Sequence, residues 1–475
     1  VGFDGRRMSR ALARDAAGVA AGMGLVVHVF DDVVPTPLLA FACRRTRAAA
    51  GVMITASHNP PEYNGYKVYW SDGAQIVPPV DAGIAAAIAA VGRIETIPRL
   101  DADEARERRR WRALGADLER AYLDGVGALP LHPEGPRDLT VAYTALHGVG
   151  SRLALAALRE AGFSRVVGVA EQAEPDGAFP TVAFPNPEEE GAMDHVLALA
   201  RRERADLVLA NDPDADRLAV AVRDDDGGYV QLTGNEVGSL LGHYLLDQGA
   251  AEGRRLVVST IVSSPMLGAI ARAHGARWEQ TLTGFKWIAQ RAMELEAREG
   301  LRFVLGYEEA LGYTVGDLVR DKDGIGAAVV MADLAAWCRS RGRTVLDELE
   351  AAWRRYGMYL SRQVARVHAG PGGAARIAET MRAVRAAPPA TIAGHAVEAT
   401  SDLSTGRRRR ADGDDEALAL PASDVLAFEL AGGHRVTMRP SGTEPKLKAY
   451  LDVRVELAAD EPLSAARARG EALLD

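Results

Sequence analysis

The chain has 475 residues, which exceeds the size at which one hydrophobic core stops growing, so we expect several domains. Hydrophobic residues make up 48% and charged residues 25%, and no apolar run approaches the about 20 residues of a membrane span, so we expect a cytoplasmic protein with no membrane partner. The formal charge of −9 argues against nucleic-acid binding, and only 2 cysteines exclude a disulfide framework and leave oxygen ligands for any metal.

Three stretches along the chain share one plan, in which a short apolar strand runs directly into a polar loop. We predict these strands at residues 51–54, 206–210 and 302–305, with helix-like sequence before them, for example at residues 11–21 and 38–49. This alternation predicts α/β units. Because ligands in open α/β sheets bind beyond the carboxyl ends of strands, the three polar loops are candidate walls of one site.

The C-terminal part differs from the rest. We predict a helix at residues 374–387 and strands at residues 425–430, 434–438 and 447–453, which indicate a smaller α+β domain. The loop between the last two strands, residues 439–445, is dense in turn-forming residues and hydroxyl groups. We therefore expect three α/β domains and a distinct fourth, at residues 1–136, 137–249, 250–368 and 369–475.

The loop after the second of these strands carries a candidate metal site. Asp212, Asp214 and Asp216 alternate along an extended segment, which can turn three carboxylates toward one point, and hard oxygen ligands suit Mg²⁺. Arg217 follows at once, with a guanidinium suited to phosphate oxygens. An acidic surface turn is the alternative interpretation. The neighbouring acidic run at residues 224–226 precedes two glycines and predicts a hairpin turn.

Ser57 lies in the loop after the first strand. Most loop serines serve as helix caps or contact solvent, but Asn59 and the prolines that follow it favour a rigid loop that can hold a side chain in place. His58 and Lys67 add hydrogen-bond donors and groups that can carry a proton. Lys67 lies in strand-like sequence that could return past the loop.

Two further loops offer groups for a sugar phosphate. Glu308 and Glu309 can accept hydrogen bonds from adjacent sugar hydroxyls or act as acid and base, while a helix N-terminus is the structural alternative. Arg439, Ser441, Thr443 and the backbone around Gly442 predict a phosphate-binding loop, and a tight hairpin is the alternative there.

Lysine is rare in this chain: five lysines stand against 51 arginines. Sites that need a compact ammonium group resist replacement by arginine, so the surviving lysines are candidate site residues, and chance survival is the alternative. They are Lys67, Lys286, Lys322, Lys446 and Lys448. The arginine run at residues 407–410 is flanked by acidic residues and predicts a solvated loop of mixed charge with no partner.

Four motifs together make the chain resemble the α-D-phosphohexomutase superfamily, which includes phosphoglucomutases, phosphomannomutases and phosphoglucosamine mutases. In the family's order, they are T-A-S-H-N-P at residues 55–60, D-P-D-A-D-R at 212–217, G-Y-E-E-A-L-G at 306–312 and R-P-S-G-T-E-P at 439–445. The resemblance covers essentially the whole length. It implies three similar α/β domains and a smaller α+β domain around one central cleft.

The resemblance also implies roles for individual residues. The catalytic residues would be Ser57 as the phosphorylated serine, His58, Lys67 and Arg217. The Mg²⁺ ligands would be Ser57, through its phosphoryl group, with Asp212, Asp214 and Asp216. The substrate-binding residues would be Lys286, Glu308, Glu309, Lys322, Arg439, Ser441, Gly442, Thr443 and Lys446.

Two departures from the family pattern limit the assignment. Ala310 stands where many relatives have a serine, a form that resembles bacterial phosphomannomutase-like members and the branch that handles pentose phosphates. The arginine-containing T-A-G-L-R-type segment expected before the first strand is absent, and the chain opens at Val1 as a strand already under way, which suggests missing upstream residues.

We therefore expect an intramolecular phosphotransferase that interconverts hexose 1-phosphate and hexose 6-phosphate, of glucose or mannose, through a phosphoserine and a bound 1,6-bisphosphate. Glucose 1,6-bisphosphate, or an equivalent sugar bisphosphate, would be the activator, and the protein would be a monomer or a homodimer. The alternatives are a phosphopentomutase and a non-catalytic regulatory protein that binds sugar phosphates.

Overall fold

The computed structural model describes residues 1–370, 372–441 and 445–475. These residues form two compact units, which are described separately: residues 1–258 with 284–348, and residues 259–283 with 349–475. Among the described residues, no helix is both long enough and apolar enough to cross a membrane.

The first α/β domain contains a small mixed sheet that ends in the serine loop. The chain begins in β1, which runs parallel to β3, and β4 returns antiparallel to β3, so that Met53 lies opposite Lys67. Helices α1 and α2 pack on this sheet, and Pro37 in the first turn of α2 suits a position whose N–H needs no helical partner. The elements are β1 (Gly2–Phe3), α1 (Ser9–Gly22), β2 (Val27–Phe30), α2 (Thr36–Arg45), β3 (Ala50–Ile54), β4 (Tyr66–Trp70), α3 (Val80–Ala90), α4 (Ala102–Glu107), β5 (Trp111–Leu114) and α5 (Ala116–Gly127).

The second α/β domain has a five-stranded sheet in the order β10-β9-β8-β6-β7. Strand β8 lies in its centre, parallel to β6 and antiparallel to β9, and all of its residues are buried, as its apolar sequence predicts. The elements are β6 (Thr140–Thr144), α6 (Ser151–Glu160), β7 (Arg165–Gly168), α7 (Asp194–Glu203), β8 (Leu207–Asn211), β9 (Leu218–Arg223) and β10 (Tyr229–Leu232).

The remainder of the first unit surrounds the strand that carries Glu308. Strand β13 pairs antiparallel with β14, and a buried cluster that includes Leu256, Ile288 and Phe303 joins β11, α10 and β13. Residues 324–338 of α11 are all buried, and the sequence there is apolar apart from Asp333, whose carboxylate pairs with Arg137 at 2.7 Å. The elements are α8 (Gly234–Gln248), β11 (Arg255–Thr260), α10 (Phe285–Glu299), β13 (Arg302–Glu308), β14 (Gly312–Val315) and α11 (Gly324–Ser340). The division between the units falls within β11, after Val258, and within α12 (Val345–Tyr356), after Glu348.

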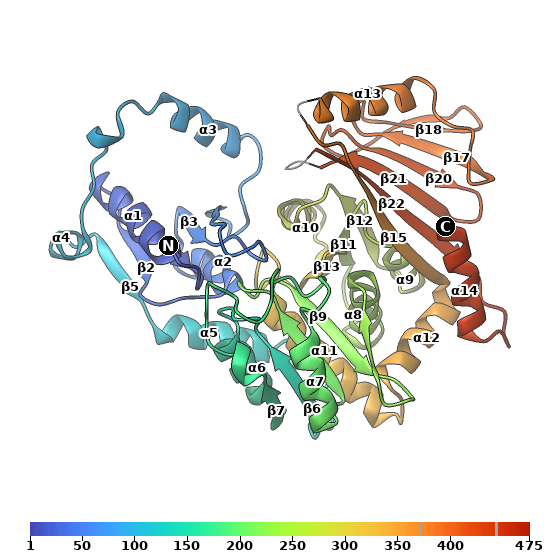
Figure 1. Cartoon of the computed structure of the whole chain (residues 1–475), viewed down its shortest axis with the longest axis horizontal. Helices are drawn as coiled ribbons and strands as arrows, with labels where there is room; N and C mark the ends of the chain where they lie inside the picture. The colour runs from blue at the N-terminus through green and yellow to red at the C-terminus, as the bar shows by residue number, and fades with distance from the viewer. Residues whose placement is uncertain (371, 442–444) are drawn as a thin grey trace. The chain divides into compact units, whose positions relative to one another are not determined.

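The second unit is dominated by one antiparallel sheet, in the order β15-β22-β21-β20-β17-β18-β19 with β16 beside β17, drawn in orange to red in Figure 1. Met381 of α13 packs on Leu426, Phe428 and Leu430 of β20. The elements are α9 (Met266–Ala273), β12 (Arg277–Thr281), β15 (Met358–Val367), α13 (Gly373–Ala386), β16 (Thr391–Ile392), β17 (His395–Asp402), β18 (Arg407–Arg410), β19 (Asp415–Ala417), β20 (Leu426–Leu430), β21 (His434–Pro440), β22 (Lys446–Val455) and α14 (Leu463–Leu474).

The loop prediction for residues 407–410 is wrong, because these arginines form strand β18. The strand is stabilised by pairing across the ladder: Arg407 lies 2.7 Å from Asp415, and Arg408 forms ion pairs with Glu416 and Glu429. Opposite charges on neighbouring strands make a charged sequence compatible with a sheet. The acidic run at residues 224–226 forms the predicted hairpin, closed by the Asp224 N–H donating to the Gly228 carbonyl at 3.1 Å.

The predicted fold class is confirmed: α/β domains are followed by an antiparallel sheet domain with helices. The predicted C-terminal helix and three strands are all present within two or three residues of their expected bounds. The four domain boundaries and the central cleft stay predictions.

Candidate active site

Ser57 is held in an unusual conformation at the end of β3. Its φ is +51°, in the left-handed region that non-glycine residues rarely adopt, and its N–H donates to the Thr55 hydroxyl oxygen at 2.9 Å. The Ser57 hydroxyl donates to Asp212 Oδ2 at 2.7 Å and lies 3.3 Å from His58 Nδ1. Burial, assisted by the charge of Arg217, lowers the pKa of His58 to about 3, so this ring is neutral at physiological pH.

The three aspartates of the loop after β8 converge, as their spacing predicts. Asp212, Asp214 and Asp216 have no exposed surface, and one carboxylate oxygen from each lies within 4.8 Å of the others. Oδ1 of Asp214 and Oδ1 of Asp216 are buried and have no hydrogen-bond partner among the described residues. A buried carboxylate oxygen without a partner is costly unless a ligand binds it, so this donor set fits Mg²⁺.

The turn after β6, residues 145–149, was not predicted as part of the site, but it packs against the aspartate loop, residues 212–217. Val149 donates its N–H to the Pro213 carbonyl at 2.8 Å, and Gly148 lies so close that an added Cβ would stand 2.4 Å from Pro213 Cα. On the other side, Asn211 donates to the Arg217 carbonyl at 2.6 Å. The sequence feature that could have identified this turn is the apolar strand β6, which runs directly into a loop as the three predicted strands do.

Two of the rare lysines contact the aspartates. Lys67 Nζ lies 2.8 Å from Asp214 and 2.9 Å from Asp216, and Lys322 Nζ lies 3.1 Å from Asp216. Burial opposes the charge on Lys67, but the aspartates outweigh it and raise the pKa of Lys67 well above its usual value. Burial likewise opposes ionisation of Asp214, yet Lys67 holds the pKa of Asp214 below its usual value.

Asp321, next to Lys322, joins the first and third domains. Its Oδ2 accepts hydrogen bonds from the Tyr69 hydroxyl and from Gln75 Nε2, both at 2.7 Å. Its Oδ1 lies 3.3 Å from Lys322 Nζ and so fixes the ammonium group beside Asp216. Asp321 was not among the predicted site residues, although it directly precedes Lys322 in the sequence.

Glu308 is the last residue of β13 and not part of a helix N-terminus, so that alternative is wrong. The strand continues beyond its predicted end because Tyr307 and Glu308 pair with β14. Burial raises the pKa of Glu308, and the nearby charges of Lys322 and Arg217 counteract this shift. Gly312, opposite Glu308, has no room for a side chain, since a Cβ would meet Lys322 Cδ at 2.4 Å. Glu309 follows in the turn and is partly buried.

The remaining predicted substrate residues are less constrained. Lys286, near the start of α10, places its ammonium 5.6 Å from the centre of the Trp287 ring. In the second unit, Arg439 lies on β21, and the Ser441 N–H donates to the carbonyl of Lys446 on β22 at 2.8 Å. Gly442 and Thr443 lie outside the described residues.

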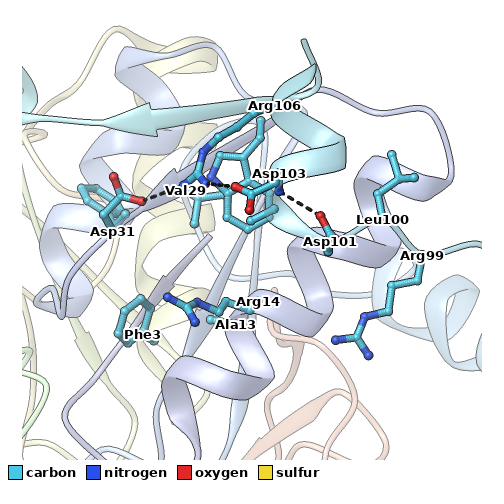
Figure 2. Close-up of a pocket in the computed structure, with 13 residues that line it drawn as sticks. Phe3, Ala13, Arg14, Val29, Asp31, Arg99, Leu100, Asp101, Asp103 and Arg106 are labelled. Carbon is cyan, nitrogen blue, oxygen red and sulfur yellow. Dashed lines mark hydrogen bonds and ion pairs between the residues drawn. The ribbon is translucent and has the colours of Figure 1, made fainter. Parts of the chain in front are cut away.

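A cavity of about 480 Å³ lies elsewhere in the first domain and contains none of the predicted site residues. Figure 2 shows Arg106 directed toward Asp103 and Asp31, from which it lies 2.9 and 4.0 Å away. Arg99, on the same rim, is paired with Asp15. The cluster of carboxylates and lysines around Ser57 is therefore the candidate active site.

This site, on α/β domains followed by an antiparallel sheet domain, defines an enzyme class, the sugar phosphate mutases. Models of phosphoglucomutase/phosphomannomutase α/β/α domains I, II and III match residues 1–94, 120–227 and 233–356. The chain belongs to this family, within the α-D-phosphohexomutase superfamily, and is a mutase of phosphoglucomutase/phosphomannomutase type.

Similar proteins are named for three different sugars. A "Probable phosphomannomutase" of Haemophilus influenzae is 43% identical over 96% of this chain and 87% of its own length. A phosphopentomutase of Homo sapiens is 36% identical over 94% of this chain and 74% of its own. A phosphoglucomutase of Staphylococcus epidermidis is 34% identical over 95% of this chain and 82% of its own.

Solved structures share the fold. A phosphoglucomutase/phosphomannomutase family protein from Burkholderia thailandensis matches with a TM-score of 0.69 at 19% identity, covering 100% of this chain and 88% of that chain. An N-acetylphosphoglucosamine mutase of Aspergillus fumigatus, solved with GlcNAc-6P and magnesium, matches with a TM-score of 0.53 at 14% identity, covering 92% of each chain.

Proposed function

We propose that this enzyme interconverts hexose 1-phosphate and hexose 6-phosphate, with glucose or mannose as the sugar, through a phosphorylated Ser57. The observation that carries the proposal is the 2.7 Å hydrogen bond from the Ser57 hydroxyl to Asp212, which places the serine against three buried carboxylates. Three carboxylates beside the serine would repel the negative charge of a phosphoryl group on its oxygen. The site becomes suited to phosphoryl transfer when a cation neutralises these carboxylates.

Asp212, Asp214 and Asp216 are the proposed Mg²⁺ ligands, together with the Ser57 phosphoryl group. The orphaned oxygens of Asp214 and Asp216 support this assignment. When bound, the ion neutralises charge on the transferring phosphoryl group. The remaining catalytic roles belong to side chains of the enzyme.

In the proposed reaction, a free hydroxyl of the sugar attacks the phosphorus on Ser57. A new phosphorus–oxygen bond forms to the sugar while the bond to Ser57 Oγ breaks, giving a sugar bisphosphate. Lys67 supplies a proton to the departing serine oxygen and regains one from the sugar hydroxyl. The bisphosphate then turns around and returns its other phosphoryl group to Ser57, which regenerates the enzyme and releases the isomeric monophosphate. A sugar bisphosphate such as glucose 1,6-bisphosphate would therefore act as activator, by phosphorylating Ser57.

The other predicted residues are proposed to orient the substrate. Glu308 would accept hydrogen bonds from sugar hydroxyls, and Glu309 and Lys286 would contact the sugar phosphate. Arg217 and Lys322 add positive charge beside the carboxylates, where they stabilise negative charge on the transferring group. We propose that the loop containing Arg439, Ser441, Gly442, Thr443 and Lys446 holds the phosphate that does not react.

A phosphopentomutase is the second candidate, favoured by relatives with that name and by Ala310 in the sugar loop. Coupled assays with glucose 1-phosphate, mannose 1-phosphate and ribose 1-phosphate, each with and without glucose 1,6-bisphosphate, separate the two candidates. A kcat/KM for ribose 1-phosphate well above that for both hexose phosphates would favour the pentose assignment. If phosphorylated, Mg²⁺-loaded protein turned over none of the three substrates, both mutase assignments would be wrong. The remaining alternative would be a non-catalytic protein that binds sugar phosphates.

The role of Ser57 has its own test. We expect Ser57→Ala to abolish mutase activity and the mass increase of one phosphoryl group after incubation with glucose 1,6-bisphosphate. Ser71→Ala is the matched control, because Ser71 is exposed in a neighbouring loop. Full activity of Ser57→Ala would refute the phosphoserine mechanism.

A further inference from the structure

Arg6 is a buried arginine whose guanidinium binds the backbone of the serine loop, residues 55–63. Only 3% of its surface is exposed. Nη1 donates to the carbonyls of Pro60 at 2.7 Å and Tyr63 at 3.1 Å, and Nη2 donates to the carbonyls of Ser57 at 2.7 Å and Asn59. Both terminal nitrogens of one side chain thus serve main-chain groups within seven residues of the loop.

Other residues fix the position of Arg6. Asp4 Oδ2 lies 3.3 Å from Arg6 Nε, and Asp4 Oδ1 accepts hydrogen bonds from the Arg6 N–H at 3.0 Å and from the Ser9 hydroxyl at 2.6 Å. Asn64, at the exit of the loop, donates to the Ser9 oxygen at 3.1 Å. The Arg6 guanidinium also lies 5.0 Å from the centre of the Phe179 ring of the second domain. The guanidinium therefore has the Asp4 carboxylate and the Phe179 ring beside it on the sides that the loop does not occupy.

The loop needs such a partner, because its carbonyl groups converge. Carbonyls withdrawn from water without a donor are unfavourable, and Ser57 must in addition hold a left-handed φ of +51°. A guanidinium offers five N–H groups in a rigid fork, whereas a lysine ammonium is a single point with three rotatable donors. Lysine can therefore replace only some of these hydrogen bonds at once.

We propose that Arg6 is a positioning residue for phosphoryl transfer: by binding the loop carbonyls it holds the Ser57 oxygen in line with the aspartates. The inference rests on the proposed function of Ser57, but its structural part is independent of it. The four hydrogen bonds of the Arg6 terminal nitrogens all go to main-chain carbonyls of the loop and none to the Ser57 hydroxyl. Its loss should therefore affect the rate of transfer and leave sugar-phosphate affinity nearly unchanged.

The structural part is tested by hydrogen exchange on the full-length protein. We expect Arg6→Ala to increase exchange in peptides covering residues 55–65 and to leave peptides of β6 and β8 at wild-type rates. Arg7→Ala is the matched control, because Arg7 is the adjacent residue and is exposed. Wild-type exchange in residues 55–65 of Arg6→Ala would overturn the proposal whether or not the protein is a mutase.

The functional part is tested by kinetics with the sugar phosphate that wild type turns over best. We expect kcat of Arg6→Ala to fall roughly 10²-fold, the effect of displacing a reacting group by about 1 Å, with KM within threefold of wild type. Arg6→Lys should lose less, and added guanidinium ion should partly restore Arg6→Ala but not Ser57→Ala. Unchanged kcat, or a loss carried entirely by KM, would overturn the proposal. If Arg6→Ala does not fold, Arg6→Lys is judged by the same kinetic and exchange criteria.

Discussion

Gly148 offers a sharp test of how the aspartate loop is positioned, because its replacement adds one methyl group at one known place. A Cβ at Gly148 would stand 2.4 Å from Pro213 Cα, 2.5 Å from the Pro213 carbonyl oxygen and 2.7 Å from the Ala145 carbonyl oxygen. All three neighbours are backbone atoms, which cannot turn aside as a flexible side chain can. The φ of Gly148 is not in the left-handed region, so alanine is disfavoured by contact and not by backbone conformation.

The size of the effect follows from these distances. Ordinary contacts begin at 3.4 Å, so the segment that contains Pro213 must retreat by about 1 Å from the 2.4 Å position. A displacement of this size costs roughly 10² in rate when it moves a catalytic group. Asp212 and Asp214 flank Pro213 directly, so we expect Gly148→Ala to lower kcat/KM by about that factor and to weaken Mg²⁺ binding.

The assay compares Gly148→Ala with Gly127→Ala in the coupled mutase reaction, with Mg²⁺ titration and thermal melting of both variants. Gly127 ends α5, is exposed and has no atom within 4 Å of an added Cβ, so its variant should keep wild-type activity. If Gly148→Ala kept kcat/KM and Mg²⁺ affinity within twofold of wild type, the argument that this turn positions the aspartates would be wrong.

Three other predictions concern charge. Asp214→Asn should lower Mg²⁺ affinity of unphosphorylated protein more than roughly 100-fold in calorimetry, beyond the usual effect of an outer-shell residue, while the exposed Asp226→Asn should not. The pKa of His58 is about 3 in the folded protein against 6.5 in the unfolded chain, so the unfolded state binds more protons between these values and stability falls as pH falls below 6.5. Between pH 7 and pH 5, wild type should lose about 2 kcal/mol more unfolding free energy than His58→Gln in urea titrations, and equal losses would contradict the shift. Arg407→Ala, which removes an exposed pair with Asp415, should lower the free energy of unfolding only slightly at low salt, and the difference should vanish at about 1 M salt; a cost that survives high salt would speak against a screened surface pair.

The sequence was sufficient to locate the loops because their chemistry is local. The aspartates at alternate positions and the strand before them lie within ten residues, and the structure brings them together with Ser57, Lys67 and Lys322 in the first unit. The strands before these loops and the C-terminal helix and strands were also predicted, because their apolar patterns are local, whereas the apolar helix α3 has no buried residue.

Supporting residues could not be found in this way, since their roles depend on backbone groups far along the chain. Arg6 binds carbonyls 51 to 57 residues away, and nothing in its own neighbourhood marks it out from Arg7. Gly148 matters only because Pro213 lies against it. The strand at Arg407–Arg410 was missed for a related reason: the acidic residues beside it were visible in the sequence, but only the ladder shows that they lie on a paired strand.

The hydrogen bonds that Asp321 accepts from Tyr69 and Gln75 also limit how this enzyme can be recombined. The carboxylate belongs to one α/β domain and its two donors to another, and the same residue steadies Lys322 beside Asp216. A chimera that took only its first domain from another mutase would keep Asp321 buried and would need a hydroxyl and an amide at positions 69 and 75 to satisfy it. These two α/β domains are therefore best exchanged together.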